Sequence, residues 1–475
     1  MSTKTSATPE IITPEWVKDA IFYQIFPDRF ARSSRAPELP GIQFKPWGTP
    51  AAEQGYQGGD LYGIIDQLDY LKALGINALY LNPIFSSASN HRYHTFDYFQ
   101  VDPLLGGNEA FTELLAEAHQ RDIKVVLDGV FNHASRGFWA FHHILENGPD
   151  SPYVDWFHIK DWPLNPYPRH GEEELNYHGW WDLPALPKFN TDNPGVRAYL
   201  FEVAEYWVRQ GIDGWRLDVP HEIEDDSFWR EFRQRVKAIN PEAYIVGEIW
   251  DKADHWLQGD QYDAVMNYPL GTAALSFFGA DSLRLDYKQN HLDYTPETAP
   301  SMAKRASTVL EWYSWPVTQV QLNMLDSHDM PRALWLVQGD KTALMQALAF
   351  VLTMPGAPCI YYGTEVGMTG GNDPDCREAF PWHQPEVMDV SMREQVTLLC
   401  HARHQWPILR RGNVALSALN DDVLLATRVL GDQQAWVVYN RTDQPLSRAL
   451  LSGVVPESAA EQVLLGEQAV VLYTA

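Results

Sequence analysis

Eight short apolar runs recur along the chain, and the stretches between them carry a helical pattern. A continuous apolar run of this length is typical of a strand buried on both faces of a parallel sheet. The intervening segments, such as 108–122 and 194–211, place apolar residues three and four positions apart, which predicts amphipathic helices. The runs cover residues 20–26, 78–85, 123–131, 214–219, 244–250, 264–270, 320–326 and 358–365.

Eight strands that alternate with helices predict an α/β fold, specifically a (β/α)8 TIM barrel. An open doubly wound sheet is the alternative. It is disfavoured because no glycine-rich phosphate loop follows the first run.

Two regions depart from this alternation. Residues 134–188 are rich in Trp, Tyr, Pro and His and lack a helical period, so we expect an inserted subdomain over the barrel mouth, between strand three and helix three. From residue 412 the runs alternate or are β-branched and are separated by turn residues. We therefore predict a barrel from 1–133 and 189–411 (domain A), the insert at 134–188 (domain B) and a β-sandwich-like antiparallel domain at 412–475 (domain C).

Composition narrows the classes of partner. The net charge of −26 argues against nucleic acid and anionic membranes, because both are polyanions. No apolar stretch is long enough to span a bilayer, and the N-terminus lacks the apolar core of an export signal, so we expect a cytoplasmic protein. The 3 cysteines lack zinc-like spacing and are expected to be reduced.

Three carboxylates stand at the ends of predicted strands: Asp218, Glu248 and Asp329. The C-terminal ends of barrel strands meet at one rim, so these acids should face one another across a cavity. Cleavage of a glycosidic bond needs such a set, with one nucleophile and one proton carrier. Arg216, two residues before Asp218, should lower the pKa of that carboxyl, whereas partial burial should raise the pKa of Glu248. A single acid at such a position commonly forms a salt bridge, but three acids at one rim favour a catalytic role.

With these acids in place, five segments of the chain resemble the signatures of the α-amylase superfamily of retaining glycoside hydrolases. In chain order they are "DGVFNH", "LPKFN", "GWRLDVPHE", "VGEIW" and "MLDSHD". The segments "IFYQIFPDRFA", "YQGGDLYGI" and "EVGMTGGNDPDCR" resemble the neopullulanase, cyclomaltodextrinase and maltogenic amylase branch in particular. The resemblance covers essentially the whole predicted barrel.

The resemblance implies roles for individual residues. Asp218 would be the nucleophile, Glu248 the acid/base, and Asp329 the group that stabilises the transition state. The remaining residues would bind substrate: Tyr93, His133, Arg216, His221, Glu222, Trp250, His328, Asp373 and Arg377.

The sequence also departs from its apparent relatives. His94 stands where many of them have Asp, and His221 stands where this branch has Asn. The first predicted strand begins near residue 20, so we expect no N-terminal β domain of the kind this branch carries. The loop after "DRF" lacks the Asn and Asp ligands that bind calcium in relatives, and Asp60 is expected to cap local backbone. We expect no cofactor and no required metal, with calcium binding left open.

Three functions compete at this point. The first is hydrolysis of α-1,4-glucosidic bonds in maltooligosaccharides, cyclodextrins or related α-glucans. The second is a transglycosylase, 4-α-glucanotransferase or glucosyl isomerase that uses the same covalent intermediate. The third is a non-catalytic carbohydrate-binding protein, which the intact set of three acids disfavours. An α-glucan oligosaccharide is the expected partner in every case, and the chain could act as a monomer or a homo-oligomer.

Overall fold

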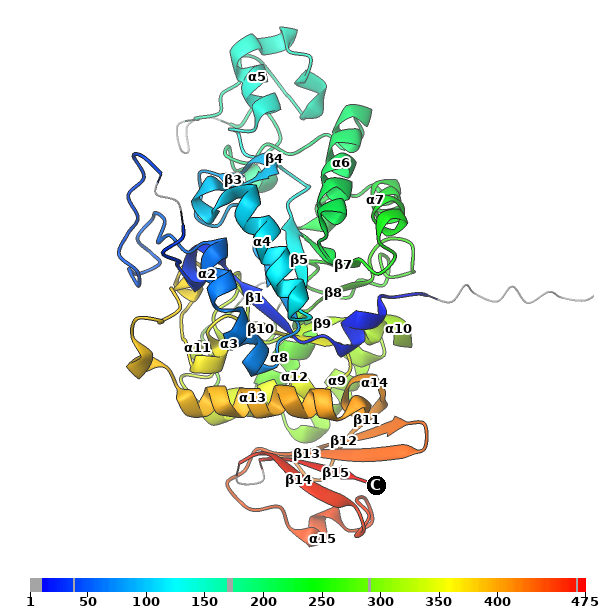
Figure 1. Cartoon of the computed structure of the whole chain (residues 1–475). Coiled ribbons are helices and arrows are strands. Elements are labelled where there is room, and N and C mark those ends of the chain that lie inside the picture. Colours follow the sequence, from blue (N-terminus) through cyan, green and yellow to red (C-terminus); the bar gives the residue numbers. More distant parts are fainter. Residues whose placement is uncertain (1–10, 37–38, 169–173, 289–291, 467–468) are drawn as a thin grey trace, which may run out of the picture.

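The computed structural model describes residues 11–36, 39–168, 174–288, 292–466 and 469–475. Eight parallel strands close into a barrel in the order β1-β10-β9-β8-β7-β6-β5-β2, which confirms the predicted architecture (Figure 1). The strands are β1 (Phe22–Ile25), β2 (Ala78–Leu81), β5 (Lys124–Gly129), β6 (Gly214–Leu217), β7 (Tyr244–Gly247), β8 (Ala264–Asn267), β9 (Leu322–Met324) and β10 (Ala357–Tyr361).

Most strands end earlier than the apolar runs suggest, and this changes where the acids stand. Asp218 and Glu248 each follow their strand directly, because β6 ends at Leu217 and β7 at Gly247. The expectation that Asp329 ends the seventh strand is wrong, because β9 ends at Met324. Asp329 instead lies in the following loop, where its N–H donates to Ser327 Oγ at 3.2 Å.

Helices surround the barrel at the predicted positions. The segment 194–211 gives α6 (Pro194–Gln210), which begins where the Asn193 side chain accepts from Gly195 N–H and ends at Gly211 with φ of 111°. The other helices are α1 (Pro27–Phe30), α2 (Leu61–Asp66), α3 (Leu68–Leu74), α4 (Gly107–Gln120), α7 (Asp226–Ile239), α8 (Tyr268–Phe278), α9 (Ala299–Leu310), α10 (Trp315–Thr318), α11 (Ala333–Leu336), α12 (Lys341–Thr353), α13 (Val390–Gln405) and α14 (Pro407–Arg411). Single 3-10 turns are η1 (Glu15–Asp19), η2 (Pro103–Leu105), η3 (Gly148–Asp150), η4 (Val154–Trp156), η5 (Trp180–Asp182), η6 (Pro220–Glu222), η7 (Thr364–Val366), η8 (Asp375–Arg377) and η9 (Pro385–Val387).

A small antiparallel hairpin follows the second barrel strand, and the sequence did not predict it. It pairs β3 (Phe85–Ser87) with β4 (Thr95–Val101), and the register shifts along the pair. The loop between the two strands carries Tyr93 to the barrel mouth.

The insert at 134–188 contains a helix that the sequence reading missed, so the expected lack of helical period is wrong. It is α5 (Trp139–Asn147), which buries Ala140, Phe141 and Ile144 on one face. The apolar residues of α5 are spaced three to four apart, but this period is difficult to recognise among the many aromatic and histidine residues of the segment. Antiparallel bridges join His133 to Lys188 and Phe157 to Phe189, which bring the two ends of the segment together and pair its middle with the residue that follows it. Residues 169–173 lie outside the described part, and treatment of the insert as a separate domain stays a prediction.

The C-terminal region forms one antiparallel sheet in the order β11-β12-β13-β15-β14. Among the described residues it is a single sheet rather than the expected sandwich. Residues alternate along β13: Val437 packs on the barrel helices, whereas Trp436 and Val438 pack on the opposite face with Leu451 of α15. Helices on both faces replace a second sheet. The bounds are β11 (Asn413–Ala418), β12 (Val423–Leu430), β13 (Gln433–Asn440), β14 (Ala460–Leu465), β15 (Val470–Thr474) and α15 (Arg448–Leu451).

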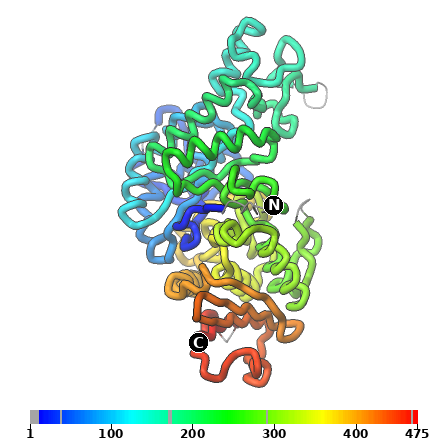
Figure 2. The backbone as a smooth tube through the Cα atoms, turned by 90° about the vertical axis from the view of Figure 1, so that its right-hand side faces the viewer, coloured from blue at the N-terminus to red at the C-terminus, as the bar shows by residue number. Residues whose placement is uncertain are grey.

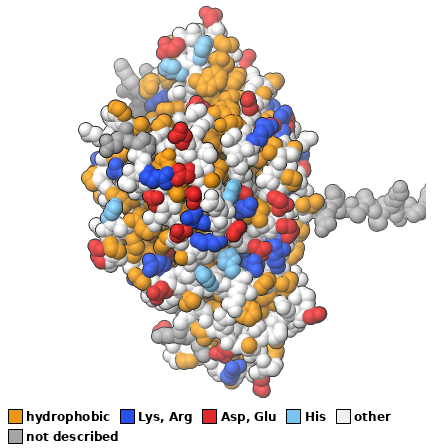
Figure 3. Space-filling model, viewed as in Figure 1, with side chains coloured by type: hydrophobic (Ala, Val, Ile, Leu, Met, Phe, Trp, Pro, Cys, Tyr) orange, Lys and Arg blue, Asp and Glu red, His pale blue; other side chains and the backbone are white. Residues whose placement is uncertain are grey.

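Figure 2 shows the insert and the C-terminal sheet at opposite ends of the barrel. On the face drawn in Figure 3, charged side chains of both signs are interspersed, and a hydrophobic group gathers near the insert. Within the described ranges, no helix has the length and apolar character needed to cross a membrane.

Candidate active site

A cavity of about 780 Å³ opens at the C-terminal ends of the barrel strands. This is the face where (β/α)8 enzymes place their chemistry. The side chains that line it are His91, Tyr93, His94, His133, Trp180, Trp181, Leu183, Leu186, Asp218, Val219, His221, Glu222, Glu248, Trp250, Asp329, Asp373 and Arg377. All three predicted catalytic acids and seven of the nine predicted substrate-binding residues are in this set.

The two predicted residues that do not line the cavity, Arg216 and His328, lie fully buried behind it. Arg216 Nη1 donates to Asp218 Oδ1 at 3.0 Å and to Asp128 Oδ1 at 2.8 Å, and Nη2 lies 2.9 Å from Glu248 Oε2. One guanidinium therefore holds three carboxylates. The sequence predicted its contact with Asp218 but not its contacts with the other two.

Asp128 is a site residue that the sequence analysis missed. It is the last but one residue of strand β5 and lies beside Arg216, its partner in the parallel register with β6. Its carboxylate also accepts from Tyr80 Oη at 3.0 Å and from Tyr93 Oη at 2.7 Å. A signal was present, because Asp128 opens the segment "DGVFNH". Which residue it opposes depends on strand register, which the sequence does not give.

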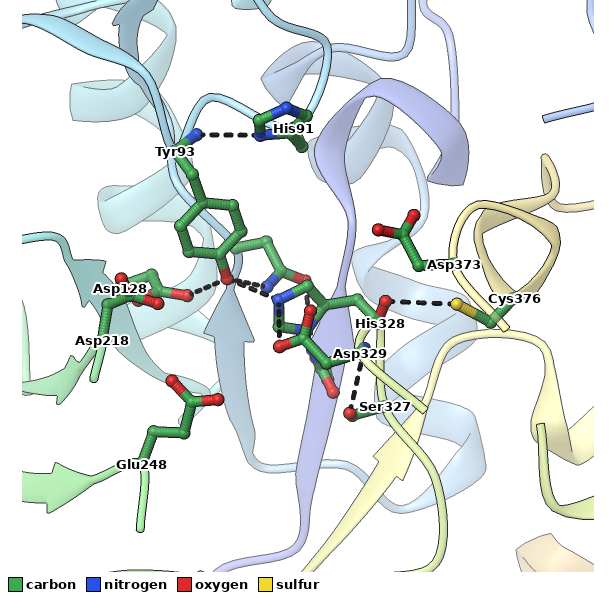
Figure 4. A network of polar contacts seen from close by, with 12 residues as sticks. His91, Tyr93, Asp128, Asp218, Glu248, Ser327, His328, Asp329, Asp373 and Cys376 are labelled. Atoms are coloured by element: carbon green, nitrogen blue, oxygen red, sulfur yellow. Dashed lines mark hydrogen bonds and ion pairs between the residues drawn. The ribbon is translucent and has the colours of Figure 1, made fainter. Parts of the chain in front are cut away.

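Glu248 is oriented by two hydrogen-bond donors and one ion pair around its carboxyl group. Val219 N–H donates to Oε2 at 3.1 Å and Trp250 Nε1 to Oε1 at 3.1 Å, in addition to the contact with Arg216. Figure 4 shows Asp218 and Glu248 on neighbouring strands, with Asp329 reaching towards them from the loop after β9.

The pKa values of Asp218 and Glu248 are set by burial and by repulsion from neighbouring carboxylates. Burial raises the pKa of Glu248 to about 7, although Arg216 opposes the shift, and this agrees with the sequence expectation. Burial and the neighbouring Glu248 also raise the pKa of Asp218. The expectation of a lowered pKa is thus wrong, because burial and the charge of Glu248 outweigh the opposing effect of Arg216. Two such carboxyls titrate as a pair, so a proton on Glu248 removes the repulsion that Asp218 feels.

Asp329 is held in the opposite state. Burial works to raise its pKa, but His328 and Arg377 outweigh burial, and the pKa of Asp329 is lowered. Arg377 Nη2 donates to Asp329 Oδ1 at 3.1 Å, and its Nη1 lies 2.9 Å from Asp373 Oδ1. Asp329 is therefore an anion at the wall of the cleft, clamped to Arg377.

The neutral His328 links Asp329 to Tyr93. Burial lowers the pKa of His328 to about 3. Gln24 Nε2 lies 2.9 Å from Nδ1 and can only donate, so Nε2 carries the hydrogen. That nitrogen lies 2.5 Å from Tyr93 Oη and 3.0 Å from Asp329 Oδ2. The rings of Tyr93 and His328 are parallel within 4° at 5.4 Å, so the tyrosine is fixed in place before any ligand binds.

Backbone strain accompanies the nucleophile candidate. Val219, directly after Asp218, has φ of 36° and ψ of 50°, a left-handed conformation that is costly for a β-branched residue. This turn aims the Val219 N–H at Glu248 and is thereby part of the acid pair's geometry.

The insert supplies one wall of the cleft as a stack of three rings. The ring of His133 lies 5.2 Å from that of Trp180, which lies 4.8 Å from that of Trp181, and both pairs are stacked. Trp181 has φ of 50° and is 77% exposed. His133 Nε2 is buried and has no hydrogen-bond partner among the described residues, so it is available to a ligand in the cleft.

Glu222 is placed by the insert as well. Lys188, in the segment "LPKFN", lies 3.1 Å from Glu222 Oε2 and donates to its backbone oxygen at 2.7 Å. His221 and Glu222 both line the cavity next to Val219.

Comparison with known proteins agrees with this site. Residues 24–397 match the family model described as "Alpha amylase, catalytic domain". A "Cyclomaltodextrinase" from Geobacillus thermopakistaniensis is 46% identical over 91% of this chain and 70% of its own length. An "Intracellular maltogenic amylase" from Bacillus subtilis is 38% identical over 90% of this chain and 69% of its own length.

Among solved structures, the "Nostoc punctiforme Debranching Enzyme" in its native form superposes with a TM-score of 0.86 at 47% identity, and 98% of each chain is covered. Across five curated relatives of the cyclomaltodextrinase, neopullulanase and maltogenic amylase kinds, this chain spans 61% to 75% of their length. The branch that the sequence motifs suggested is confirmed by these similarities.

Proposed function

The chain belongs to the alpha-amylase family, and on this premise we propose that it cleaves α-1,4-glucosidic bonds by double displacement with retention of configuration. Its substrates would be maltooligosaccharides, cyclodextrins or related α-glucans. The observation that carries the proposal is the set of three carboxylates joined by Arg216 and Arg377 around one cavity. The relatives' names support an α-glucan glycosidase, and the site supplies the chemistry that such an enzyme needs.

In the first step, Glu248 donates its proton to the glycosidic oxygen while Asp218 attacks the anomeric carbon. A pKa of about 7 leaves Glu248 protonated in a large fraction of molecules at neutral pH. Once Glu248 carries the proton, Arg216 favours the charged form of Asp218 that attack requires. Positive charge that develops on the sugar would be stabilised by the anionic Asp329.

In the second step, Glu248 removes a proton from water, and the hydroxide breaks the ester bond between Asp218 and the sugar. The leaving group would depart past Trp250, whose indole N–H already contacts the acid. A sugar hydroxyl in place of water would give transglycosylation, which is the alternative outcome from the same intermediate.

The insert favours compact substrates in this proposal. Trp180 and Trp181 stand over one side of the cleft, and Leu183 and Leu186 add apolar surface beside them. Aromatic faces bind the C–H faces of sugars, so this wall would shorten the cleft and grip small or cyclic glucans. The other aromatic residues of the insert, Trp156, Trp162 and Tyr177, pack in or against the hydrophobic core and do not line the cavity.

Product analysis on maltotriose, β-cyclodextrin, pullulan and soluble starch tests the proposal. We expect higher kcat/KM for maltotriose and β-cyclodextrin than for starch, with glucose and maltose as products. Longer products from maltotriose would identify transglycosylation. Equal or higher kcat/KM for starch would reject the compact cleft but not the glycosidase activity.

We further propose that activity needs no added metal. Asp60 caps α2, and its two carboxylate oxygens accept from Ser33 N–H at 2.9 Å and from Gly63 N–H at 2.8 Å, as the sequence suggested. Part of the loop after "DRF", residues 37–38, lies outside the described residues. Activity that is unchanged after dialysis against EDTA would support this, and recovery on addition of calcium alone would reject it.

A cytoplasmic location is also proposed. Similarity to an enzyme named as an intracellular maltogenic amylase supports it. Fractionation of the source cells with an antibody against the chain tests it directly.

A further inference from the structure

Gln24 lies behind the catalytic cleft, in the barrel strand β1, and the sequence motifs did not single it out. The side chain is fully buried. Alternate residues of a strand point to the same side, and Phe22 packs against Tyr244 of β7 across the barrel. Gln24 therefore also points into the barrel interior, one layer nearer the cleft. It brings an amide to a place where barrel interiors usually hold apolar side chains.

The amide nitrogen of Gln24 makes two contacts, and both lead to the cleft. Nε2 lies 2.9 Å from His328 Nδ1 and donates to Asn82 Oδ1 at 3.1 Å. Asn82 Nδ2 in turn donates to Tyr93 Oη at 3.0 Å. Gln24 Oε1 has no hydrogen-bond partner among the described residues, so the amide is held through its nitrogen. One buried side chain thus reaches His328 directly and Tyr93 through Asn82.

The hydrogen of the His328 ring can be placed from its neighbours on the cleft side (Figure 4). Nε2 lies 3.0 Å from Oδ2 of the anionic Asp329, so a hydrogen stands between these two atoms. Tyr93 Oη, 2.5 Å from the same nitrogen, donates its own hydrogen to Asp128 and accepts from His328. An uncharged ring has only one hydrogen, so Nδ1 is an acceptor and needs a donor opposite it. Gln24 supplies that donor.

The backbone of His328 is held by other groups, so Gln24 is not needed to anchor the residue. Arg377 Nε donates to the His328 carbonyl at 2.8 Å, and Cys376 Sγ donates to it at 3.1 Å. The ring also stacks on that of Tyr93. What Gln24 adds is a hydrogen that faces Nδ1 and opposes a second proton on the ring.

Charges of both signs face the His328 ring. Asp329 favours a protonated ring, whereas Arg377 and Arg216 disfavour it. An imidazolium would neutralise Asp329, whose negative charge the proposed mechanism uses in the transition state. The amide of Gln24 acts in the same direction as the two arginines, and it acts at the nitrogen that faces away from the cleft.

We propose that Gln24 is a positioning residue for the reaction: its amide keeps His328 uncharged, with the single hydrogen on Nε2, so that Asp329 keeps its full negative charge towards the sugar. This inference rests on the proposed function. In Gln24→Glu the interaction is reversed, because a carboxylate accepts at Nδ1. The ring then lies between two carboxylates, which favour hydrogens on both of its nitrogens.

NMR of protein labelled with nitrogen-15 histidine reads the hydrogens of His328 directly, and His328→Gln identifies the signals by their loss. At pH 7 we expect an uncharged wild-type ring with its hydrogen on Nε2. In Gln24→Glu we expect both nitrogens to be protonated. A wild-type ring with its hydrogen on Nδ1, or unchanged signals in Gln24→Glu, would overturn the inference.

Kinetics give a second readout. In Gln24→Glu, kcat for maltotriose should fall about 10²-fold while KM changes by less than about twofold, because the charge of Asp329 acts in the transition state. Gln346→Glu is the matched control. Gln346 is also buried, but its Nε2 donates to the Asn440 carbonyl at 2.7 Å, at the junction with the C-terminal sheet. The kcat of its folded fraction should stay at the wild-type value, and an equal loss of kcat in both variants would reject the positioning role.

Gln24→Met covers the case in which Gln24→Glu folds poorly, because methionine is close in size and carries no charge. Without a donor at Nδ1, the His328 ring should take up its second proton at a pH about one unit or more above that of wild type. Rings that titrate together in Gln24→Met and wild type would contradict the inference. A wild-type protein that does not cleave maltotriose would reject the proposed function instead, and the NMR signals would still report on His328.

Discussion

Two regions of this molecule bury arginine in opposite ways. At the barrel mouth, Arg216 is surrounded by carboxylates: Asp128, Asp218 and Glu248. At the junction with the C-terminal sheet, Arg403 and Arg428 are equally buried but meet backbone carbonyls. Arg403 donates to Leu352, Met354 and Gly356, and Arg428 donates to Thr353, Leu409, Gly412 and Asn413.

The difference lies in what the partners can do. Carboxylates titrate, so the charge at the mouth depends on pH, and one proton can move within the cluster. Carbonyls do not titrate, so Arg403 and Arg428 meet fixed dipoles at the end of α12, and no proton can be exchanged there. Burial lowers the pKa of Arg403 to about 9 and of Arg428 to about 10, yet both values leave the guanidinium charged at neutral pH. The mouth is thus arranged for reaction and the junction for stability.

The largest expected effect separates the two regions by activity. Asp218→Asn keeps the volume of the side chain but removes the nucleophile, so kcat should fall by about 10³-fold or more. The melting temperature should not fall, because the substitution removes a buried acid. Assays with maltotriose and thermal unfolding check both points. Retention of more than a small fraction of the wild-type rate would contradict the assigned role.

Removal of the junction arginine should give the converse result. Arg428→Met leaves four backbone carbonyls without their donor, and the free energy of unfolding should fall by about 3–5 kcal/mol. The kcat/KM of the folded fraction should stay at the wild-type value. Urea unfolding gives the stability.

The matched control is Arg448→Met on the same sheet domain. The Arg448 side chain is 66% exposed, so the free energy of unfolding should change by no more than about 0.5 kcal/mol. Similar losses in both variants would show that the buried carbonyl contacts contribute little.

A smaller effect is the loss of folding stability that accompanies ionisation of Glu248. The pKa of Glu248 in the folded protein, about 7, lies above the ordinary glutamate pKa of 4.5. The stability associated with its proton is therefore complete below pH 4.5 and is lost as the pH rises through 7. Glu248→Gln replaces the titrating carboxyl with a neutral amide at every pH. At pH 8 the variant should therefore be more stable than wild type by on the order of 2 kcal/mol, and at pH 4.5 its free energy of unfolding should exceed that of wild type only slightly.

Glu109→Gln, at an exposed position on α4, serves as the control and should show no gain at either pH. Urea unfolding at the two pH values measures the difference. A gain for Glu248→Gln that is equal at pH 4.5 and pH 8 would mean that the charge of Glu248 is not its origin.

The last effect is the pH dependence of the rate. The acid must be protonated in the free enzyme, so kcat/KM should fall above about pH 7 and approach a tenfold loss per unit. A rate that stays constant from pH 7 to 9 would reject Glu248 as the proton donor.

Much of this arrangement was accessible from the sequence, and the failures have physical causes. The eight strands and the three acids were predicted because buried parallel strands give continuous apolar runs and the motifs follow them directly. Asp128 was missed because strand register decides its contact with Arg216. The pKa of Asp218 was predicted in the wrong direction because a sequence does not reveal how deeply this carboxyl is buried or how near Glu248 lies.

The most direct test of the account is to trap the covalent intermediate. A 5-fluoro-α-glucosyl fluoride should inactivate the enzyme by forming an ester that is hydrolysed slowly, and mass spectrometry of proteolytic peptides locates it. The account predicts one label, on Asp218, in the peptide that contains "GWRLDVPHE". A label on Glu248 or Asp329, or β-configured product released first from an α-linked substrate, would contradict it.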